Sequence, residues 1–404
     1  MTAAEQIPGP LDGITVLDCT LLIQGPWAGQ TLGDLGANVI KVEVPGRGDQ
    51  GRWLPIDYPR DMRTPFAEAA NRGKRSITLD LRVPAGRDTF LEMVKQSDIV
   101  ITNFVPQTME RWGLGYDDLA AVNDQIIMGS GSGYGPLGPD AERPGADIGG
   151  QAQGGVVAAI HDASGRAAPI PFTIADHVGA LNLTIGILAA LNERNASGRG
   201  QRVEVSLYGS IIAAQAPMFT TYFLRGEPLT TSVPGHPLVR GLYGIFPTAD
   251  GHLALVGVPG ADSKQRFYLA IGRPDLLEVE RFNEPVMQPE VQVELMDLMN
   301  DVFASRPTAE WADILRAADI RYAPVQTYEQ IADDPGAWEN GYLQTVNHHE
   351  HGEITAVGTP FRFSRTPSRP GATTPPLGAN TEEVLLEFGF GWDQIADLQA
   401  AGAL

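Results

Sequence analysis

Cysteine is almost absent from this chain of 404 residues, because Cys19 is the only one. A single thiol excludes an intrachain disulfide and any zinc site built from several cysteines. Cys19 comes soon after the apolar residues Val16 and Leu17. We therefore expect a small buried residue there, and a reactive thiol is the weaker interpretation.

An excess of positive charge is also missing. The chain has 29 Lys and Arg residues against 49 Asp and Glu, which gives a net charge of -20 and argues against nucleic acid as a partner. The basic residues are unevenly placed, since 12 of the 29 lie between Lys41 and Arg111. This distribution suits a polyanionic small ligand, although solvated surface charge explains any single residue equally well.

Long hydrophobic runs are lacking as well. The charge-free run from Val178 to Leu191 is too short to cross a bilayer. The first ten residues have neither a basic n-region nor an apolar h-region. With 43% hydrophobic residues, the composition is that of a globular protein large enough for two domains. We predict a cytoplasmic protein with no membrane partner.

The first part of the chain, residues 1–224, alternates strand and helix signals. Strands are predicted at 14–17, 39–44, 76–81, 98–102, 125–128 and 202–207. Helices are predicted at 26–35, 84–96, 108–112, 117–122 and from Asp176 to Leu191. Repeated strand–helix units predict an α/β fold with a mainly parallel sheet and with ligands beyond the carboxyl ends of the strands.

The amino-acid composition changes near residue 225, where proline, glycine and threonine become frequent. Short strands and three helices follow, which predict a smaller α+β domain over residues 225–330. The C-terminal part, residues 331–404, carries strand signals at 354–357 and 361–364 and an amphipathic helix at 381–388.

Two motifs favour a cofactor only at first sight. Gly129 to Gly135 follows a strand, as in a dinucleotide loop, but Pro136 stands where a helix should begin to receive the pyrophosphate. A nicotinamide-dependent oxidoreductase is therefore only an alternative, and a ligand loop or a wide turn fits better. The tract from His348 to His351 lacks the i, i+4 spacing of helical metal ligands, so we predict no metal site.

Asp176 stands at the head of the apolar run that predicts a core helix. One interpretation is an N-cap, which accepts hydrogen bonds from the first free backbone N–H groups. The other adds chemistry: a carboxylate kept ionised by the helix N-terminus can attack an activated acyl group.

Several segments together resemble the class III CoA-transferases, the family of formyl-CoA transferase, carnitine CoA-transferase and α-methylacyl-CoA racemase. They span nearly the whole chain in the order of the family. The matching segments are 10–14, 16–18, 25–26, 36–43, 48–49, Asn71, 74–80, 103–104, Arg111, 143–145, Asp147, 175–176, 197–201, 376–378 and 381–385.

The resemblance implies that Asp176 is the catalytic residue. It also implies a Rossmann-like large domain built from both chain ends, a smaller middle domain, and two chains interlocked as rings in a homodimer. The substrates would be an acyl-CoA and a small carboxylic acid, without a metal. The residues that fall where the family contacts CoA are Lys74, Arg75, Leu79, Asn103, Phe104 and Arg111.

The mechanism that the resemblance implies is covalent. Asp176 attacks the donor thioester, and a mixed anhydride and then an aspartyl-CoA thioester follow. Asp147 is expected to be a supporting polar group and Gln24 an orienting one, while the backbone N–H groups of Gly235 and Gly241 are candidates for stabilising oxyanions.

Departures from the family pattern bear on the reaction. Racemases carry a histidine where this chain has Ala146, so two-base racemisation would lack one base. His177 is the nearest substitute, but its helical position directs it away from its neighbour Asp176. Ile23 takes the place of a glutamine used by formyl-CoA transferases, with Gln24 one step later, and Val44 replaces an arginine. Transfer is favoured, with an acyl-CoA racemase or isomerase and a non-catalytic acyl-CoA-binding protein as alternatives.

Overall fold

The computed structural model describes residues 8–55, 64–160, 165–227, 236, 238–239, 241–258, 260–284, 287–348, 350–368, 371 and 373–404. The chain divides into two compact units. Unit 1 comprises Met1–Ala216 and Pro335–Leu404, and unit 2 comprises Pro217–Asp334. The sequence-based prediction placed these boundaries after residues 224 and 330.

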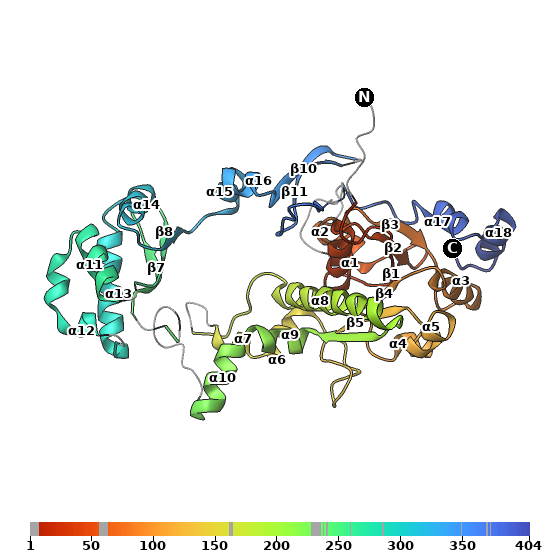
Figure 1. Ribbon diagram of the computed structural model, residues 1–404, viewed down its shortest axis with the longest axis horizontal. Helices are drawn as coiled ribbons and strands as arrows, with labels where there is room; N and C mark the ends of the chain where they lie inside the picture. Colours follow the sequence, from red (N-terminus) through yellow and green to blue (C-terminus); the bar gives the residue numbers. More distant parts are fainter. Residues whose placement is uncertain are drawn as a thin grey trace. The chain divides into compact units, whose positions relative to one another are not determined.

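Unit 1 is built on a six-stranded sheet with the order β3-β2-β1-β4-β5-β6 (Figure 1). The strands are β1 (Thr15–Asp18), β2 (Asn38–Glu43), β3 (Arg75–Thr78), β4 (Ile99–Thr102), β5 (Ile127–Ser132) and β6 (Arg202–Ser206). Neighbouring strands pair in parallel, and the order reverses between β1 and β4. The predicted α/β fold with a parallel sheet is confirmed, and this reversal is where such sheets bind ligands.

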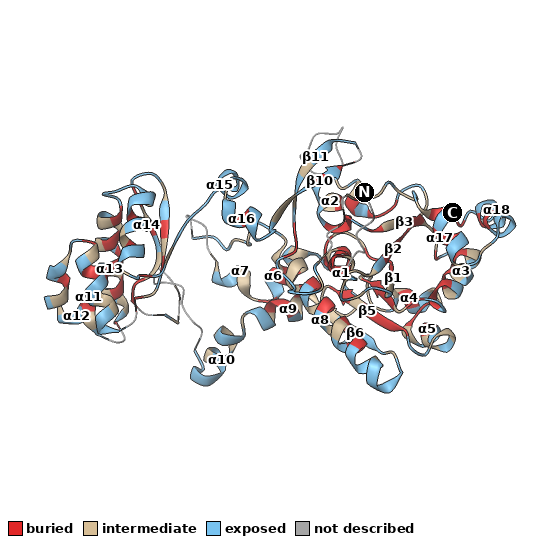
Figure 2. Cartoon of the chain, turned by 45° about the horizontal axis from the view of Figure 1, so that its top comes forward, coloured by how far each residue is buried: buried red, intermediate tan, exposed pale blue. Residues whose placement is uncertain are grey.

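Helices cover both faces of the sheet. The helices of unit 1 are α1 (Gln24–Asp34), α2 (Pro65–Asn71), α3 (Pro84–Val94), α4 (Thr108–Arg111), α5 (Tyr116–Val122), α6 (Asp147–Gln153), α7 (Val156–Ala159), α8 (Ile174–Ser197), α9 (Leu207–Ala214), α16 (Pro335–Glu339), α17 (Thr381–Glu387) and α18 (Trp392–Ala400). One core joins α1 and α8 to the sheet through residues such as Leu32, Ile101 and Ile187. The other core joins α3, α17 and α18 to the opposite face, and the strands between the two cores are buried (Figure 2).

The end of the chain completes the core that contains α3. Val384 and Leu385 of α17 belong to the same buried cluster as Ile77 of β3. The N–H of Asp80 donates to the carbonyl oxygen of Ala403 at 2.8 Å. Unit 1 is therefore assembled from both ends of the chain.

Helix α8 is longer than predicted, with 24 residues. By length and composition it passes the test for a membrane span. Its residues Leu183 and Ile187 are fully buried against the sheet, as in the core helix of a folded domain. Cys19 is buried as expected, and burial raises the pKa of its thiol well above the usual value.

Strand β5 runs to Ser132 and includes glycines that were predicted to lie in a loop or wide turn. Gly129 is required by close packing, because a Cβ there would lie 2.7 Å from Cδ1 of Ile187. A strand interior accepts glycine where another element approaches this closely.

Unit 2 has an antiparallel sheet with the order β7-β8-β9. Its elements are β7 (Tyr243–Pro247), β8 (His252–Val256), α11 (Ala261–Ala270), α12 (Glu280–Asn283), α13 (Pro289–Phe303), α14 (Thr308–Ala317), β9 (Tyr322–Pro324) and α15 (Tyr328–Ala332), and α10 (Ala216–Arg225) lies at the boundary with unit 1. Phe246, Phe267, Phe303 and Trp311 fill its core.

A hairpin in unit 1 differs from the prediction. Strand β10 (Leu343–His348), which the sequence analysis missed, pairs antiparallel with β11 (Gly352–Val357). Residues 361–364, predicted as a strand, are not one.

Candidate active site

Asp176 lies in the first turn of α8, as the third helical residue. The helix is capped by a different residue. Oδ1 of Asp147, at the start of α6, accepts the backbone N–H of Ala175 at 2.7 Å and that of Asp176 at 3.2 Å. The interpretation of Asp176 as the N-cap is therefore wrong, because Asp147 supplies that cap from another helix and leaves the Asp176 carboxyl available for chemistry.

Asp147 is itself fixed in place. Nε2 of Gln151 donates to Oδ2 of Asp147 at 2.6 Å. Gln151 is 1% exposed, and its Oε1 accepts the N–H of Ile170 at 2.9 Å. The structure thus brings Asp147 and Asp176, both predicted site residues, to the same helix end.

The carboxyl of Asp176 has an unusual affinity for protons. Burial, and then the charge of Asp147, raise its pKa to about 7. A position at a helix N-terminus predicts an ionised carboxylate with a lowered pKa, so the direction of this shift differs from the prediction. Asp147 already accepts the nearest N–H groups, so desolvation and like-charge repulsion outweigh the helix dipole.

Gln24 begins α1 and is 4% exposed. Its side-chain amide occupies space left by two glycines. A Cβ at Gly131 would collide with Oε1 of Gln24, and a Cβ at Gly179 would lie 2.8 Å from Nε2. Gly179 is one turn after Asp176 on the same face of α8, so the amide lies on the Asp176 side of that helix. Among the described residues, Nε2 of Gln24 has no hydrogen-bond partner.

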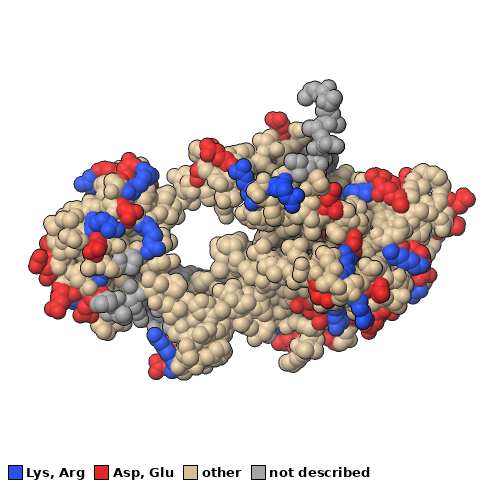
Figure 3. Space-filling model, viewed as in Figure 1, with Lys and Arg blue, Asp and Glu red and all other residues tan. Residues whose placement is uncertain are grey.

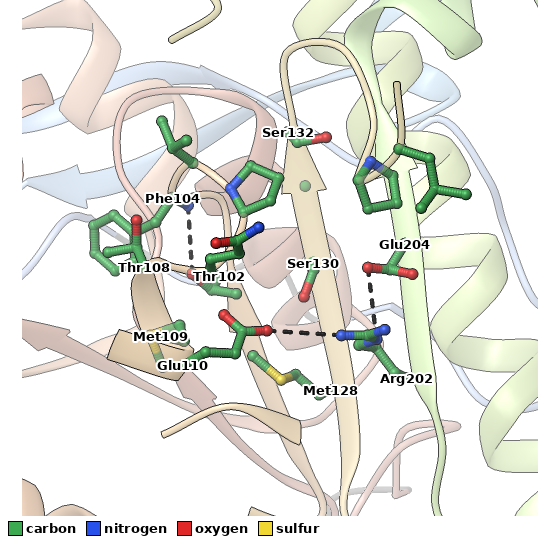
Figure 4. A pocket seen from close by; sticks show the side chains of 16 residues that line it. Thr102, Phe104, Thr108, Met109, Glu110, Met128, Ser130, Ser132, Arg202 and Glu204 are labelled. Carbon is green, nitrogen blue, oxygen red and sulfur yellow. Dashed lines mark hydrogen bonds and ion pairs between the residues drawn. The ribbon is translucent and has the colours of Figure 1, made fainter. Parts of the chain in front are cut away.

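Two cavities of about 350 Å³ each adjoin Phe104 in unit 1. Leu79 lines the first, together with Val44, Arg82 and Trp112. The second lies over the ends of β4 and β5, where Ser130 and Ser132 point into it (Figure 4). Phe104 and Leu79, both predicted CoA contacts, therefore form cavity walls.

Lys74 and Arg75 are placed differently. Nζ of Lys74 is buried and donates to Oδ2 of Asp18 at 2.7 Å, to Oδ1 of Asn71 at 2.8 Å and to the carbonyl oxygen of Pro26 at 2.7 Å. Burial is the main reason that its pKa falls to about 8. Arg75 pairs with Glu383 at 2.9 Å and Glu387 at 2.7 Å on α17. Both cations are engaged by the protein, and neither lines either cavity.

Asn103 and Arg111, the other two predicted CoA contacts, do not line the cavities but bond to residues that do. The side chain of Asn103 holds Leu21, with Oδ1 accepting the N–H at 2.8 Å and Nδ2 donating to the carbonyl oxygen at 2.7 Å. Arg111 is exposed and donates to Oγ1 of Thr108, a residue of the second cavity, at 2.8 Å.

Sequence reasoning missed two basic residues at the first cavity. Arg47 and Arg82 line it, and Arg82 also pairs with Asp80 at 2.7 Å. The concentration of basic residues between Lys41 and Arg111 was the available signal. On the visible face of the molecule, basic and acidic side chains are interspersed (Figure 3), so the positions of individual cations matter more than their number.

His177 faces a different environment from Asp176. Its Nδ1 lies 2.7 Å from the carbonyl oxygen of Thr173, so this nitrogen is the donor. Its ring packs edge-on against Trp27 at 5.3 Å between centroids, and both line a cavity beside α2. Ala146, before α6, has no side chain that moves a proton.

The histidine tract forms a cluster in which ligand atoms of His348, Glu350 and His351 lie within 4.8 Å of one another. The His348 and His351 rings stack at 4.6 Å. Nδ1 of His348 accepts the N–H groups of Glu350 and His351 at 3.1 and 3.2 Å. These contacts occupy Nδ1 of His348. Of the two candidate loop glycines, Gly241 has φ of +111° and Gly235 lies outside the described residues.

The model of CoA-transferase family III matches residues 11–381. The chain belongs to this family. CoA-transferases of family III act on acyl-CoA esters and carboxylic acids, and the chain is an enzyme of this class.

Individual relatives match most of the length of this family III chain. It is 32% identical to a succinyl-CoA–D-citramalate CoA-transferase of Chloroflexus aurantiacus, with 98% of this chain and 99% of that protein covered. It is 33% identical to a protein named probable fatty acyl-CoA transferase of Mycobacterium tuberculosis, with 88% and 92% covered. A solved CaiB/BaiF family structure from Brucella suis matches with a TM-score of 0.82 at 29% identity, covering 95% of this chain and all of that one.

Proposed function

We propose that this CoA-transferase uses Asp176 as a covalent nucleophile. The observation that carries the proposal is the geometry of the first turn of α8. There Asp147 takes the capping hydrogen bonds, and the Asp176 carboxyl, whose pKa is about 7, is on the helix side that faces Gln24. A carboxyl group with such a pKa is ionised in a substantial fraction at neutral pH and is more basic than an ordinary aspartate.

The proposed reaction proceeds by acyl transfer between oxygen and sulfur. The Asp176 carboxylate attacks the thioester carbonyl carbon, the C–S bond breaks, and CoA leaves as the thiolate. This thiolate attacks the aspartyl carbonyl of the mixed anhydride and expels the donor acid as a carboxylate. The acceptor carboxylate then attacks the aspartyl-CoA thioester, whose C–S bond breaks to give the CoA thiolate and a second mixed anhydride. The thiolate attacks the acceptor carbonyl of this anhydride and expels Asp176 as a carboxylate.

CoA is proposed to lie along the two cavities that meet at Phe104. Arg47 and Arg82 would meet its phosphates, and Leu79 and Phe104 would pack on its adenine. Arg111 and Asn103 stay in the proposal at the border of the second cavity, whereas Lys74 and Arg75 are replaced by Arg47 and Arg82.

The acid partners come from the relatives by analogy. The relatives' names pair succinyl-CoA with citramalate, glutarate or mesaconate, and one is named for fatty acyl groups. We propose a carboxylic acid as acceptor, with the protein acting as an interlocked homodimer in the cytoplasm. Gly241 stays a candidate for stabilising oxyanions.

Racemisation is the second candidate from the same family. It needs two groups that exchange a proton with the carbon next to the thioester. Ala146 supplies none, and the donor nitrogen of His177 is engaged by Thr173. Transfer is therefore the better supported reaction.

Hydroxylamine trapping tests the proposal. The protein is incubated with a mixture of acyl-CoA esters, treated with hydroxylamine and digested, and the peptide holding Asp176 is analysed by mass spectrometry. A hydroxamate on Asp176, absent in Asp176→Asn, is the expected result, and the ester consumed identifies the donor. Measurable CoA binding without any adduct would contradict the covalent mechanism, and epimerisation of a 2-methylacyl-CoA without an acid would favour the racemase.

A further inference from the structure

The loop Thr20–Ile23, which joins β1 to α1, is held by side chains from other elements. Nζ of Lys41 donates to the carbonyl oxygen of Thr20. Asn103 binds both backbone groups of Leu21. Oδ1 of Asp49 accepts the N–H of Leu22 at 2.9 Å. Backbone groups of three consecutive residues are thus tied to side chains.

Leu22 adopts a conformation that leucine avoids. Its φ is +65°, in the left-handed region. For a residue with a branched side chain this conformation is strained and persists only where the surroundings enforce it. The hydrogen bond from Leu22 to Asp49 is the contact at this residue that supplies such enforcement.

Asp49 is locked by charge. Its Oδ2 lies 2.9 Å from Nζ of Lys41, and each residue is 1% exposed. Oδ1 also accepts the N–H of Gly51 at 2.8 Å, and the N–H of Asp49 donates to Oε1 of Glu43 at 2.9 Å. A buried ion pair adds little net stability over an apolar pair of similar volume, because both charges lose their hydration. The hydrogen bonds that Oδ1 of Asp49 accepts from Leu22 and Gly51, in contrast, define one backbone geometry.

The loop leads directly into Gln24. Ile23 is the N-cap of α1 and Gln24 is its first residue, so the conformation of Leu22 sets where the Gln24 amide lies. A methyl group at either Gly131 or Gly179 would overlap the Gln24 amide, so the amide packs directly against both glycines. Displacements near 1 Å at a reacting group cost up to about 100-fold in rate.

We infer that the buried Lys41–Asp49 pair is a positioning device: it holds Leu22 in its left-handed conformation and thereby fixes the Gln24 amide beside the Asp176 face of α8. The inference rests on the proposed function in that Gln24 is taken to act in the transfer step. Lys41 and Asp49 touch neither reacting group and act through the loop.

A double-mutant cycle tests this inference with purified full-length protein. Asp49→Ala is expected to lower kcat by about tenfold or more, with a smaller change in KM for acyl-CoA. In a Gln24→Ala background, the same substitution is expected to leave kcat unchanged, because the group it positions is already gone. Asp49→Asn keeps an oxygen for the Leu22 N–H but loses the charge that pairs with Lys41, so it is expected to lower kcat by less than Asp49→Ala does.

Two controls separate positioning from folding. Asp34→Ala removes another buried ion pair, with Arg72, and should lower stability in urea without lowering kcat. Lys41→Met combined with Asp49→Leu replaces the charged pair by apolar groups, so a folded protein with low kcat supports the inference even if Asp49→Ala does not fold. Full kcat in that variant, additive effects in the cycle, or an unchanged kcat in Gln24→Ala would overturn it. Hydroxamate formation by the unsubstituted protein reports separately on the covalent mechanism.

Discussion

At the scale of single residues, the proton affinity of Asp176 has a direct kinetic consequence. Only the ionised carboxylate attacks a thioester, and its pKa is raised to about 7 by burial and by Asp147. We expect kcat/KM to rise with pH through about 7. Asp147→Asn removes the repelling charge and should move this rise in kcat/KM to lower pH, as measured from initial rates across pH. If the rise in kcat/KM occurs at the same pH in Asp147→Asn, it reports the ionisation of another group.

The same shift affects stability. Because the pKa of Asp176 is higher in the folded protein than its usual value of 3.8, the folded state binds the proton more tightly. The free energy of unfolding therefore falls as pH rises from about 4 to about 7, and the penalty is complete above 7. We expect Asp176→Asn to abolish transfer and to raise the free energy of unfolding above pH 7, by up to about 4 kcal/mol. Urea denaturation at several pH values measures this; an equal gain below pH 4 would contradict it.

The affinity for CoA should depend on the basic residues that line the first cavity and not on those that lie elsewhere. Arg82→Ala should weaken CoA binding by about tenfold, the value of one charge-assisted hydrogen bond. Arg75→Ala is the matched control and should leave the affinity unchanged, because Arg75 faces Glu383 and Glu387. Calorimetric titration with CoA distinguishes them, and equal losses in both variants would restore Arg75 to the CoA site.

At the scale of elements, the start of α8 depends on a side chain from α6. Asp147→Ala should lower the free energy of unfolding by about 1 kcal/mol through the lost cap, whereas Asp147→Asn keeps an acceptor and should cost less. Thermal or urea unfolding measures the difference at a pH well below 7, where Asp176 is protonated. Equal losses in the two variants would show that the cap contributes nothing.

The elements also show what the sequence can predict. The six strands of the sheet and helix α8 follow from apolar runs and periodicity, and Asp176 and Asp147 follow from the family motifs. The burial of Lys74 against Asp18, with Arg82 at the cavity, does not follow, because it depends on tertiary packing. Gly129 and Gly131 resemble a loop in sequence, and only the approach of Ile187 and Gln24 explains them as strand residues. Strand β10 was missed because its alternation is weak.

At the scale of the whole molecule, α8 has an apolar face without a partner in the described part of unit 1. Leu181 is 41% exposed and Ile185 is 63% exposed, one turn apart. This face fits the proposed homodimer, in which a second chain would cover it. Ile185→Asp should lower the yield of dimer on refolding, as measured by light scattering, while Leu386→Asp on α17 should not. A monomeric unsubstituted protein would contradict the proposal.

The closure of unit 1 by α17 has a consequence for synthesis on the ribosome. Val384 and Leu385 can pack against β3 only after about 300 further residues have been translated. The N-terminal half of the nascent chain therefore emerges with an incomplete core. Such long-range closure slows folding and exposes apolar surface in the meantime. Chains stalled before residue 381 should therefore be bound by chaperones and sensitive to proteases, whereas released chains become resistant.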